Sequence, residues 1–316
     1  PMNQKVNDFI LSVHDASMHL TPSDFHSWAL KEVRRHIDFD FAIWGAGDGK
    51  SRELHTATIL DQADNLFETW ETVKHEDPYA HLVIGNTGKT WSVEQLPDFR
   101  HTRAYSDHWG LYQARQMIST MEVDPHTGLH IFVTLARDNQ NKAFNKQEIS
   151  FKNLVTQHFF LAARHNDMHH LRSDQTPAAF IDRHGLLHAS LPEFKALLVN
   201  EWGKQAGVVL PEAVNTSLWK TGHYRGHNLA LNAERFYNRL LVRAGILSSV
   251  SLSPRETEIA WAYATGKSHK EVAKVLSISP TTVRTHLARV YQKLEISDKG
   301  ALAVWLKEHG NRPISI

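Results

Sequence analysis

Polar and cationic side chains repeat along one side of the segment 280–294, in a pattern that suits contact with DNA. At about 100° per residue, a helix over this segment gathers its apolar residues, from Val283 to Leu294, into one stripe. Its opposite side carries small or uncharged side chains that can meet base edges, flanked by cations that can reach phosphates or guanine. The residues expected to contact DNA are Ser279, Thr281, Thr282, Arg284, Thr285, Ala288, Arg289, Gln292 and Lys293.

Capping signals place this helix third in a row of short helices. Ser253-Pro254-Arg255-Glu256 offers a hydroxyl N-cap, a proline at the first helical position and a glutamate three residues after the cap. Ser268 and Glu271 repeat the capping box, and Ser279-Pro280 opens the third helix. Only residues 277–279 connect the second helix to the third, which forces a sharp crossing and predicts a helix-turn-helix.

The segment resembles the LuxR/FixJ-type helix-turn-helix, with arginine at 284 in place of the common lysine and alanine at 260 in place of leucine. This resemblance implies a fourth helix over 298–308 with Ser297 as its N-cap, and a homodimer that binds double-stranded operator DNA. RNA polymerase is left open as a further partner. The residues that match the family pattern are Leu252, Pro254, Arg255, Glu256, Gly266, Lys270, Glu271, Ala273, Thr282, Val283, His286, Lys293 and Leu294.

Charge and composition agree with a regulator of this kind. Residues 252–316 hold ten Lys/Arg against six Asp/Glu, whereas the rest of the chain holds 25 against 28. Binding through counterion release needs such a basic region. The absence of cysteine excludes disulfides, thiol redox sensing and cysteine metal sites. No run approaches the roughly 18 apolar residues of a membrane span, and no signal pattern opens the chain, so we expect a cytoplasmic protein without a membrane partner.

The preceding 250 or so residues read as an α+β domain, in which helices flank an antiparallel sheet. Helices, strands, a variable middle, another strand and a long helix follow one another, which is an α+β order. Helices are expected over 7–37, with a break at Thr21–Asp24, and over 64–74 and 145–171. Strands are expected at 39–44, 54–60 and 130–136. The residues expected on the buried side of the long helix are Ile149, Leu154, Val155, Phe159 and Leu161.

This order is similar to the GAF-like and autoinducer-binding domains that are often joined to LuxR-type helix-turn-helix units. Asp77-Pro78 followed by Trp91 matches the Asp-Pro…Trp pattern of acyl-homoserine-lactone sensors. Two departures argue against the lactone itself as the ligand. Trp70 lies closer to Asp77 than the family spacing allows, and Lys74 stands where a tyrosine partner is expected.

Aromatic residues concentrate in the same region, as the lining of a small-molecule pocket requires. Taken one by one, most of them are explained better as members of an ordinary hydrophobic core, but their concentration over 67–112 exceeds what a small core needs. We favour a hydrophobic or aromatic effector, with Asp77 as the polar anchor. The residues expected to bind it are Trp44, Phe67, Trp70, Asp77, Tyr79, Trp91, Tyr105 and Trp109.

Residues 178–214 weakly resemble part of a PAS domain. The pattern predicts strands at 179–182 and 186–190 and a helix at 191–203, then strands at 224–231 and 239–242 before a hinge at 248–251. A dimerisation segment explains the same residues as well. The predicted division is a small-molecule sensing domain over 1–171, a PAS-like or dimerisation segment over 172–248, and the DNA-binding domain over 249–316.

The chain has 22 histidines, and some stand four residues apart. Only His165, His169 and His170 fall on a predicted helix, where two imidazoles could share zinc or haem iron. The remaining pairs fall on turns or strands, where this spacing does not bring them to one face. We therefore expect solvated or structural histidines, no metal site and no cofactor. These remaining pairs are His126/His130, His184/His188 and His223/His227.

Two other classes of function fit the sequence less well. A receiver domain driven by phosphorylation needs an acidic pair after its first strand, but here the strand ends Ile43-Trp44-Gly45. An enzyme would need catalytic residues, and no nucleophile elbow, phosphate loop or metalloprotease helix is present. The sequence predicts a non-enzymatic, DNA-binding transcription regulator that responds to a small effector. Gating by a protein partner, metal, haem or phosphorylation is the open alternative.

Overall fold

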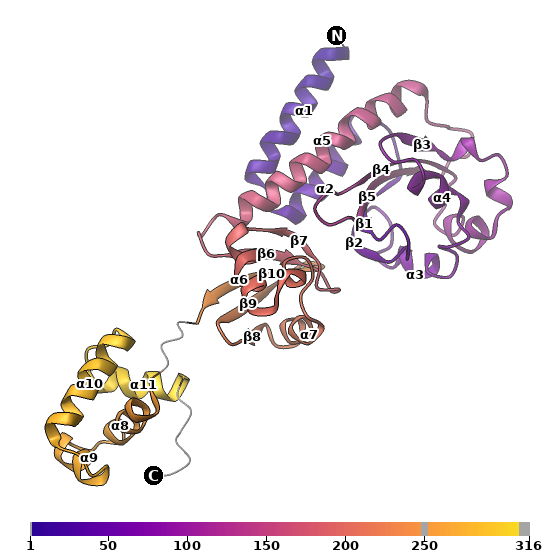
Figure 1. The fold of residues 1–316 in the computed structure, drawn as a ribbon. Helices are drawn as coiled ribbons and strands as arrows, with labels where there is room; N and C mark the ends of the chain where they lie inside the picture. The colour runs from indigo at the N-terminus through magenta and orange to yellow at the C-terminus, as the bar shows by residue number, and fades with distance from the viewer. Residues whose placement is uncertain (1, 248–251, 310–316) are drawn as a thin grey trace. The chain divides into compact units, whose positions relative to one another are not determined.

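The computed structural model describes residues 2–247 and 252–309 and divides the chain into two compact units, Pro1–Leu247 and Ser248–Ile316 (Figure 1). The first unit holds two antiparallel five-stranded sheets, and the described part of the second is helical. Both outcomes confirm the predicted fold class. The predicted hinge at 248–251 lies outside the described residues. No helix in the described part of the chain is long and apolar enough to cross a membrane.

The first sheet has the strand order β2-β1-β5-β4-β3. β1 continues past its predicted end at Trp44, because Gly45 and Gly47 stay in the strand. Gly45 pairs with Phe132 on β5, and a Cβ atom at Gly45 would lie 2.5 Å from the Phe132 ring. Glycine therefore leaves room for that ring to lie across β1. The strands are β1 (Phe41–Gly47), β2 (Leu54–Leu60), β3 (Thr90–Ser92), β4 (Gln116–Val123) and β5 (His130–Arg137).

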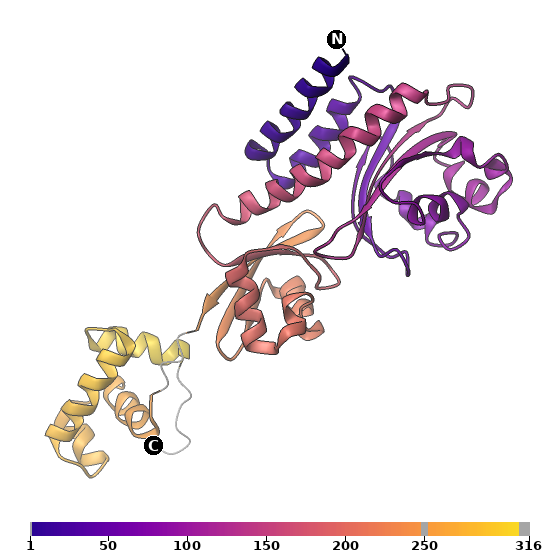
Figure 2. The ribbon, with the colours of Figure 1, turned by 45° about the horizontal axis from the view of Figure 1, so that its top comes forward.

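Helices cover one face of this sheet, and short irregular segments cover the other (Figure 2). α1 (Met2–His19), α2 (Pro22–Val33) and α5 (Lys146–Leu171) pack on the first face. The other face carries α3 (Leu66–Trp70), which is shorter than the predicted helix 64–74, and four further segments. These are α4 (Pro78–Ile84), the 3-10 turns η1 (Val93–Gln95) and η2 (Phe99–His101), and the π-helical turn η3 (Tyr105–Trp109).

The long helix α5 lies within the predicted range 145–171, and its N-cap is Asn145, whose side chain accepts hydrogen bonds from the backbone N–H groups of Gln147 and Glu148. Val155 and Phe159 are buried as predicted. The prediction was wrong for Leu154 and Leu161, which are 45% and 44% exposed. These two residues stand seven apart, so two helical turns bring both to the solvent side.

The second sheet has the order β7-β6-β10-β9-β8. One face packs on α6 (Pro192–Trp202), η4 (Lys204–Gly207) and α7 (Glu212–Thr221), and the other receives the end of α5 at Leu171. The predicted strand 224–231 is divided in two, because the chain turns between Gly226 and Leu229. The strands are β6 (Ala178–Ile181), β7 (Leu187–Ser190), β8 (His223–Arg225), β9 (Leu229–Phe236) and β10 (Arg239–Ile246).

The second unit contains α8 (Pro254–Ala264), α9 (His269–Val275), α10 (Pro280–Leu294) and α11 (Lys299–His309). Its three predicted caps are confirmed, since the hydroxyls of Ser253, Ser268 and Ser279 each accept a backbone hydrogen bond from the third residue of the following helix. The cap predicted for α11 at Ser297 was wrong: Asp298 Oδ1 accepts the Ala301 N–H at 2.9 Å. The helix therefore begins one residue later. The predicted apolar stripe of α10 is buried at Val283, Leu287, Val290 and Leu294.

An ion pair ties the end of α10 to the start of α8. Lys293 Nζ lies 2.7 Å from Glu256 Oε2, and Glu256 is buried whereas the Lys293 side chain is 45% exposed. The same carboxylate oxygen accepts the Ser253 N–H at 2.8 Å. The hydrogen bond from Lys293 holds the pKa of Glu256 below its usual value. The Lys293 ammonium therefore already has a partner within its own domain.

Truncating the core of the first unit should show which side of α5 supports the fold. We expect Phe159→Ala to lower the free energy of unfolding by about 3–5 kcal/mol, since this side chain is 1% exposed and packs against Trp44. Leu161→Ala is the matched control on the exposed side and should cost about 0.5 kcal/mol or less. Urea unfolding followed by circular dichroism measures both, and equal losses would contradict this assignment.

Replacing Lys293 with methionine should lower the free energy of unfolding of the second unit by about 1–3 kcal/mol at pH 7, because the buried Glu256 carboxylate loses its cationic partner. The pKa of Glu256 is lowered in the folded state. This stabilisation is therefore present above the unfolded-state pKa of about 4.3 and disappears as the pH falls through the lower folded-state value.

Urea unfolding of the full chain at pH 7 and at about pH 3 tests the pair, with Lys274→Met as the control, because Lys274 is an exposed lysine on the neighbouring helix. At pH 7, Lys293→Met should lower the free energy of unfolding more than Lys274→Met does. At the lower pH the two losses should become equal. A difference of the same size at both pH values would rule out the ion pair as its source.

Candidate functional site

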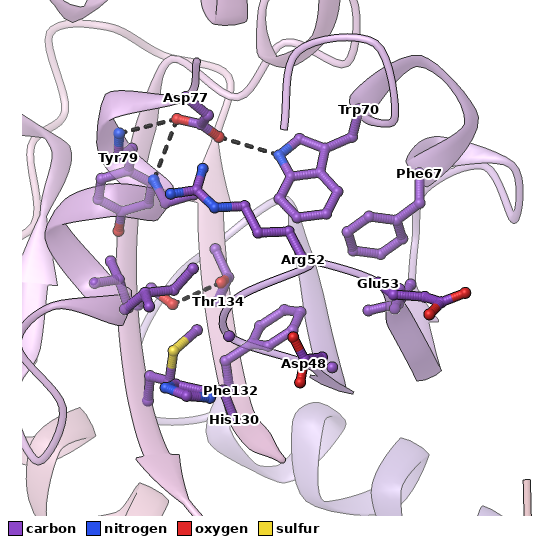
Figure 3. Close-up of a pocket in the computed structure, with 18 of the residues that line it drawn as sticks. Asp48, Arg52, Glu53, Phe67, Trp70, Asp77, Tyr79, His130, Phe132 and Thr134 are labelled. Carbon is purple, nitrogen blue, oxygen red and sulfur yellow. Dashed lines mark hydrogen bonds between the residues drawn. The ribbon is translucent and has the colours of Figure 1, made fainter. Parts of the chain in front are cut away.

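A cavity lies between the first sheet and the segments that cover its outer face (Figure 3). Its empty volume is about 630 Å³, which includes the part open to solvent. Small-molecule sites are mostly apolar with a few polar groups, and the lining of this cavity has that composition. The apolar lining is Leu54, Phe67, Trp70, Tyr79, Ala80, Val83, Ile84, Trp109, Met121 and Phe132. The polar lining is Asp48, Arg52, Glu53, Asp77, Ser119, His130 and Thr134.

Asp77 is fully buried and accepts four hydrogen bonds. Oδ1 accepts the N–H groups of Tyr79 at 2.9 Å and Ala80 at 3.2 Å, which caps α4. Oδ2 accepts the indole N–H groups of Trp70 at 3.1 Å and Trp109 at 2.8 Å. These donors match the four lone-pair sites of a carboxylate. Asp77 therefore fixes two walls of the cavity, because both indoles are held by the same oxygen.

Other polar groups in the cavity keep some capacity to contact a ligand. The hydroxyls of Ser119 and Thr134, on neighbouring strands, share a hydrogen bond of 2.8 Å. The Nδ1 atom of His130 is buried and has no hydrogen-bond partner among the described residues, and burial lowers the pKa of this imidazole. Arg52 is 8% exposed and donates to the backbone oxygen of Lys74. Its burial lowers the pKa of the guanidinium.

Five of the eight residues predicted to bind a ligand line this cavity: Phe67, Trp70, Asp77, Tyr79 and Trp109. The structure does not place Trp44, Trp91 and Tyr105 there. Trp44 faces the helices on the other side of the sheet and stacks on His26, with 4.1 Å between ring centroids. The indole of Trp91 donates to the Asn86 oxygen at 2.7 Å, and Tyr105 packs edge-on against Phe99. Alternation along β1 gives Trp44 the opposite direction from its neighbours.

Apart from Asp77, the polar residues of this cavity were not predicted from the sequence. Ser119 and Met121 lie on β4, which has no clear alternation because its residues from Gln116 to Met121 are buried on both faces. His130 and Thr134 lie on a predicted strand, where a period of two puts them on the same face as Phe132. This alternation is the sequence signal that could have identified His130 and Thr134 as cavity residues. We find no sequence signal for Arg52.

On α10, the predicted DNA-contacting residues form an exposed side opposite the buried stripe. Thr281, Arg284, Thr285, Ala288, Arg289 and Gln292 are exposed. Three predicted residues have structural roles. Ser279 caps the helix and shares a 2.8 Å hydrogen bond with the hydroxyl of the half-buried Thr282, and Lys293 pairs with Glu256.

The two arginines on this side remain available for an external partner. Within the described residues, no hydrogen bond or ion pair engages the side chain of Arg284 or of Arg289. The exposed side of α10 therefore presents two guanidinium groups beside Ala288 and Gln292.

Comparison with known proteins identifies the second unit. The family model described as bacterial regulatory proteins, luxR family, matches residues 250–306. The transcriptional regulatory protein LiaR of Bacillus subtilis (strain 168) is 42% identical over 55 residues, which are 17% of this chain and 26% of LiaR. The chain aligns with about a quarter of the length of relatives such as LiaR, and with 6–18% of some others. These matches concern one domain.

Solved structures give weaker likenesses. Escherichia coli SdiA has 13% sequence identity and a TM-score of 0.37, covering 98% of each chain. The VqsR LBD domain from Pseudomonas aeruginosa has 10% identity and a TM-score of 0.40, covering 51% of this chain and 94% of that one. At these scores, neither likeness says what the first unit binds. The family match agrees with the three capped helices and with the exposed cationic side of α10. Residues 250–306 therefore belong to the luxR family of bacterial regulatory proteins.

Proposed function

We propose that this protein is a transcription regulator that binds operator DNA through α10 and responds to a small molecule bound in the cavity of its first unit. The exposed side of α10 supports the DNA-binding part, since Arg284 and Arg289 flank small and uncharged side chains there. Such a helix fits the major groove, which is about 12 Å wide. Arginine binds guanine through two parallel hydrogen bonds, and Gln292 has the amide that recognises adenine.

The proposed regulator acts as a cytoplasmic homodimer without catalytic activity. Two copies of α10 related by two-fold symmetry would contact half-sites about 34 Å apart, which is one turn of DNA. We assign effector sensing to residues 1–171, a PAS-like or dimerisation role to 172–248, and DNA binding to 249–316. RNA polymerase stays a further candidate partner.

The lining of the cavity supports one class of effector. Aromatic and aliphatic walls favour an apolar body, and Arg52 is a cationic donor for an acceptor group at one end. Ser119, Thr134 and the unpaired nitrogen of His130 add further hydrogen-bonding groups. Asp77 contributes by holding Trp70 and Trp109, because its own acceptor sites are taken. The effector proposed is therefore a hydrophobic or aromatic compound with one polar acceptor end.

We expect Arg284→Ala to weaken operator binding by ~1–3 kcal/mol and to weaken binding to random duplex less, because a base contact carries sequence discrimination. The operator is first selected from a random DNA library with the full chain. Fluorescence anisotropy then measures the affinity of each variant for this operator and for random duplex. Lys307→Ala is the control, since it removes one exposed positive charge from the same domain. If Arg284→Ala still prefers the operator over random duplex as strongly as wild type does, Arg284 takes no part in base recognition.

Filling the cavity should remove effector binding. We expect Met121→Trp to abolish the binding of aromatic and medium-chain acyl compounds that wild-type protein shows in ligand-detected NMR, because Met121 lines the cavity and is 7% exposed. Val123→Trp is the matched control on the same strand, where the side chain is 45% exposed. If both variants keep the same bound compounds as wild type, the effector site lies elsewhere.

A further inference from the structure

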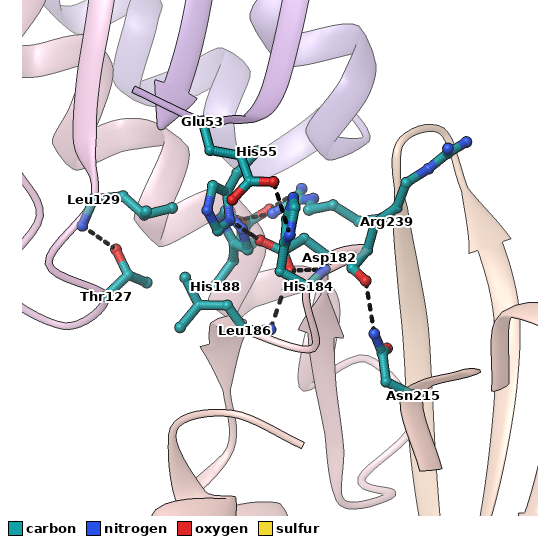
Figure 4. A network of polar contacts seen from close by, with 12 residues as sticks. Glu53, His55, Thr127, Leu129, Asp182, His184, Leu186, His188, Asn215 and Arg239 are labelled. Atoms are coloured by element: carbon teal, nitrogen blue, oxygen red, sulfur yellow. Dashed lines mark hydrogen bonds and ion pairs between the residues drawn. The ribbon is translucent and has the colours of Figure 1, made fainter. Parts of the chain in front are cut away.

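Histidine and carboxylate side chains from the two sheets of the first unit meet at one point that the proposed function does not use (Figure 4). His55 comes from β2 of the first sheet, and Asp182 and His188 come from the β6–β7 hairpin of the second. One ligand-type atom of each lies within 4.8 Å of those of the other two. Glu53 and His184 stand beside them and form a second such group with His55.

Both imidazoles contact the same carboxylate oxygen. Asp182 Oδ2 lies 2.5 Å from His55 Nδ1 and 2.8 Å from His188 Nε2. Asp182 is fully buried, and the side chains of His55 and His188 are 10% and 11% exposed. Burial alone raises the pKa of Asp182, but the hydrogen bonds from His188 and His55 outweigh it and keep the pKa well below its usual value.

The turn that carries Asp182 fixes the direction of its carboxylate. Oδ1 accepts the N–H groups of His184 at 2.8 Å and Leu186 at 3.0 Å. Gly185, with φ +79°, lets the chain reverse within this hairpin. These bonds leave Oδ2 directed at the two imidazoles. Backbone donors that orient a carboxylate in this way are typical of the outer shell of metal sites.

The group also has a side that solvent can reach. The His184 side chain is 36% exposed, its ring centroid lies 4.3 Å from that of His55, and its Nδ1 lies 3.6 Å from Glu53 Oε1. An ion could therefore enter past His184 and Glu53. Either side chain, or a water molecule, could complete its coordination.

We propose that His55, Asp182 and His188 bind a divalent transition-metal ion of the zinc class, with the fourth position taken by water or His184. Imidazole and carboxylate are ordinary zinc ligands, and three protein ligands with one open position make a recognised zinc geometry. Zinc bonds of about 2.0–2.2 Å set ligand atoms roughly 3.3 Å apart around a tetrahedron. The ligand atoms must therefore part slightly from their hydrogen-bonded positions, which small rotations of the two imidazoles accomplish.

Such an ion would join the two sheets of the first unit. His55 and Asp182 are 127 residues apart in sequence, and the contact between them links β2 to the β6–β7 hairpin. A bound ion would replace two hydrogen bonds by metal–ligand bonds that exist only in the folded chain, so it would stabilise that chain.

Zinc titration of the chelator-stripped full chain, in competition with a chromophoric chelator, tests the site. Wild-type protein should bind one ion per chain at this site and gain thermal stability. His55→Gln and His188→Gln should each weaken binding by at least about 100-fold, because outer-shell partners alone contribute about 10–100-fold. His126→Gln is the control, since it removes an exposed histidine from another turn. The control should bind zinc like wild type.

Two results would overturn the proposal. One is wild-type protein that binds no zinc, and the other is equal affinity in wild type, the two variants and the control. A wild-type crystal soaked in zinc covers the case in which the variants fold poorly. Anomalous scattering should then show the ion bonded to His55, Asp182 and His188. An ion bound only elsewhere, or none, would leave these residues as a hydrogen-bonded link between the sheets.

Discussion

The cavity of the first unit depends on one buried carboxylate. The segments over the outer face of the first sheet are short, and they include a five-residue helix and a π-helical turn. Asp77 joins three of them, because it caps α4 and holds the indoles of Trp70 on α3 and Trp109 on η3. A buried charge is costly unless hydrogen bonds satisfy it. The same bonds that meet this requirement position the aromatic walls.

A second buried carboxylate, Asp182, also needs hydrogen bonds to offset the cost of burying its charge, but it receives them from different partners. Asp77 accepts only indole and backbone N–H groups, which cannot bind a metal ion. Asp182 accepts two backbone N–H groups on one oxygen and two imidazoles on the other. Imidazole nitrogen can exchange a proton for a metal, so only the second arrangement can also act as a coordination site. The chemistry of the donors thus separates a structural carboxylate, Asp77, from Asp182, for which we propose a metal ion as ligand.

In the second unit, one helix serves both the core and the proposed DNA contact. The buried stripe of α10 packs on the other helices, and the ion pair of Lys293 with Glu256 fixes its end to the start of α8. A side chain held in this way contributes to the position of the helix. The proposed recognition of DNA is therefore assigned to the exposed positions along the helix, where the side chains of Arg284 and Arg289 have no competing partner among the described residues.

The sequence by itself determined the features that short-range chemistry encodes. Serine caps predicted the starts of α8, α9 and α10, and the strand expected at 54–60 is observed as β2 with the same bounds. Tertiary structure alone decided which side chains meet. Trp44 turned away from the cavity, β4 was hidden by burial on both faces, and His188 found its partners 133 and six residues away, at His55 and Asp182. Spacing along a chain predicts neighbours within one helix or strand, whereas neighbours across sheets depend on register and packing.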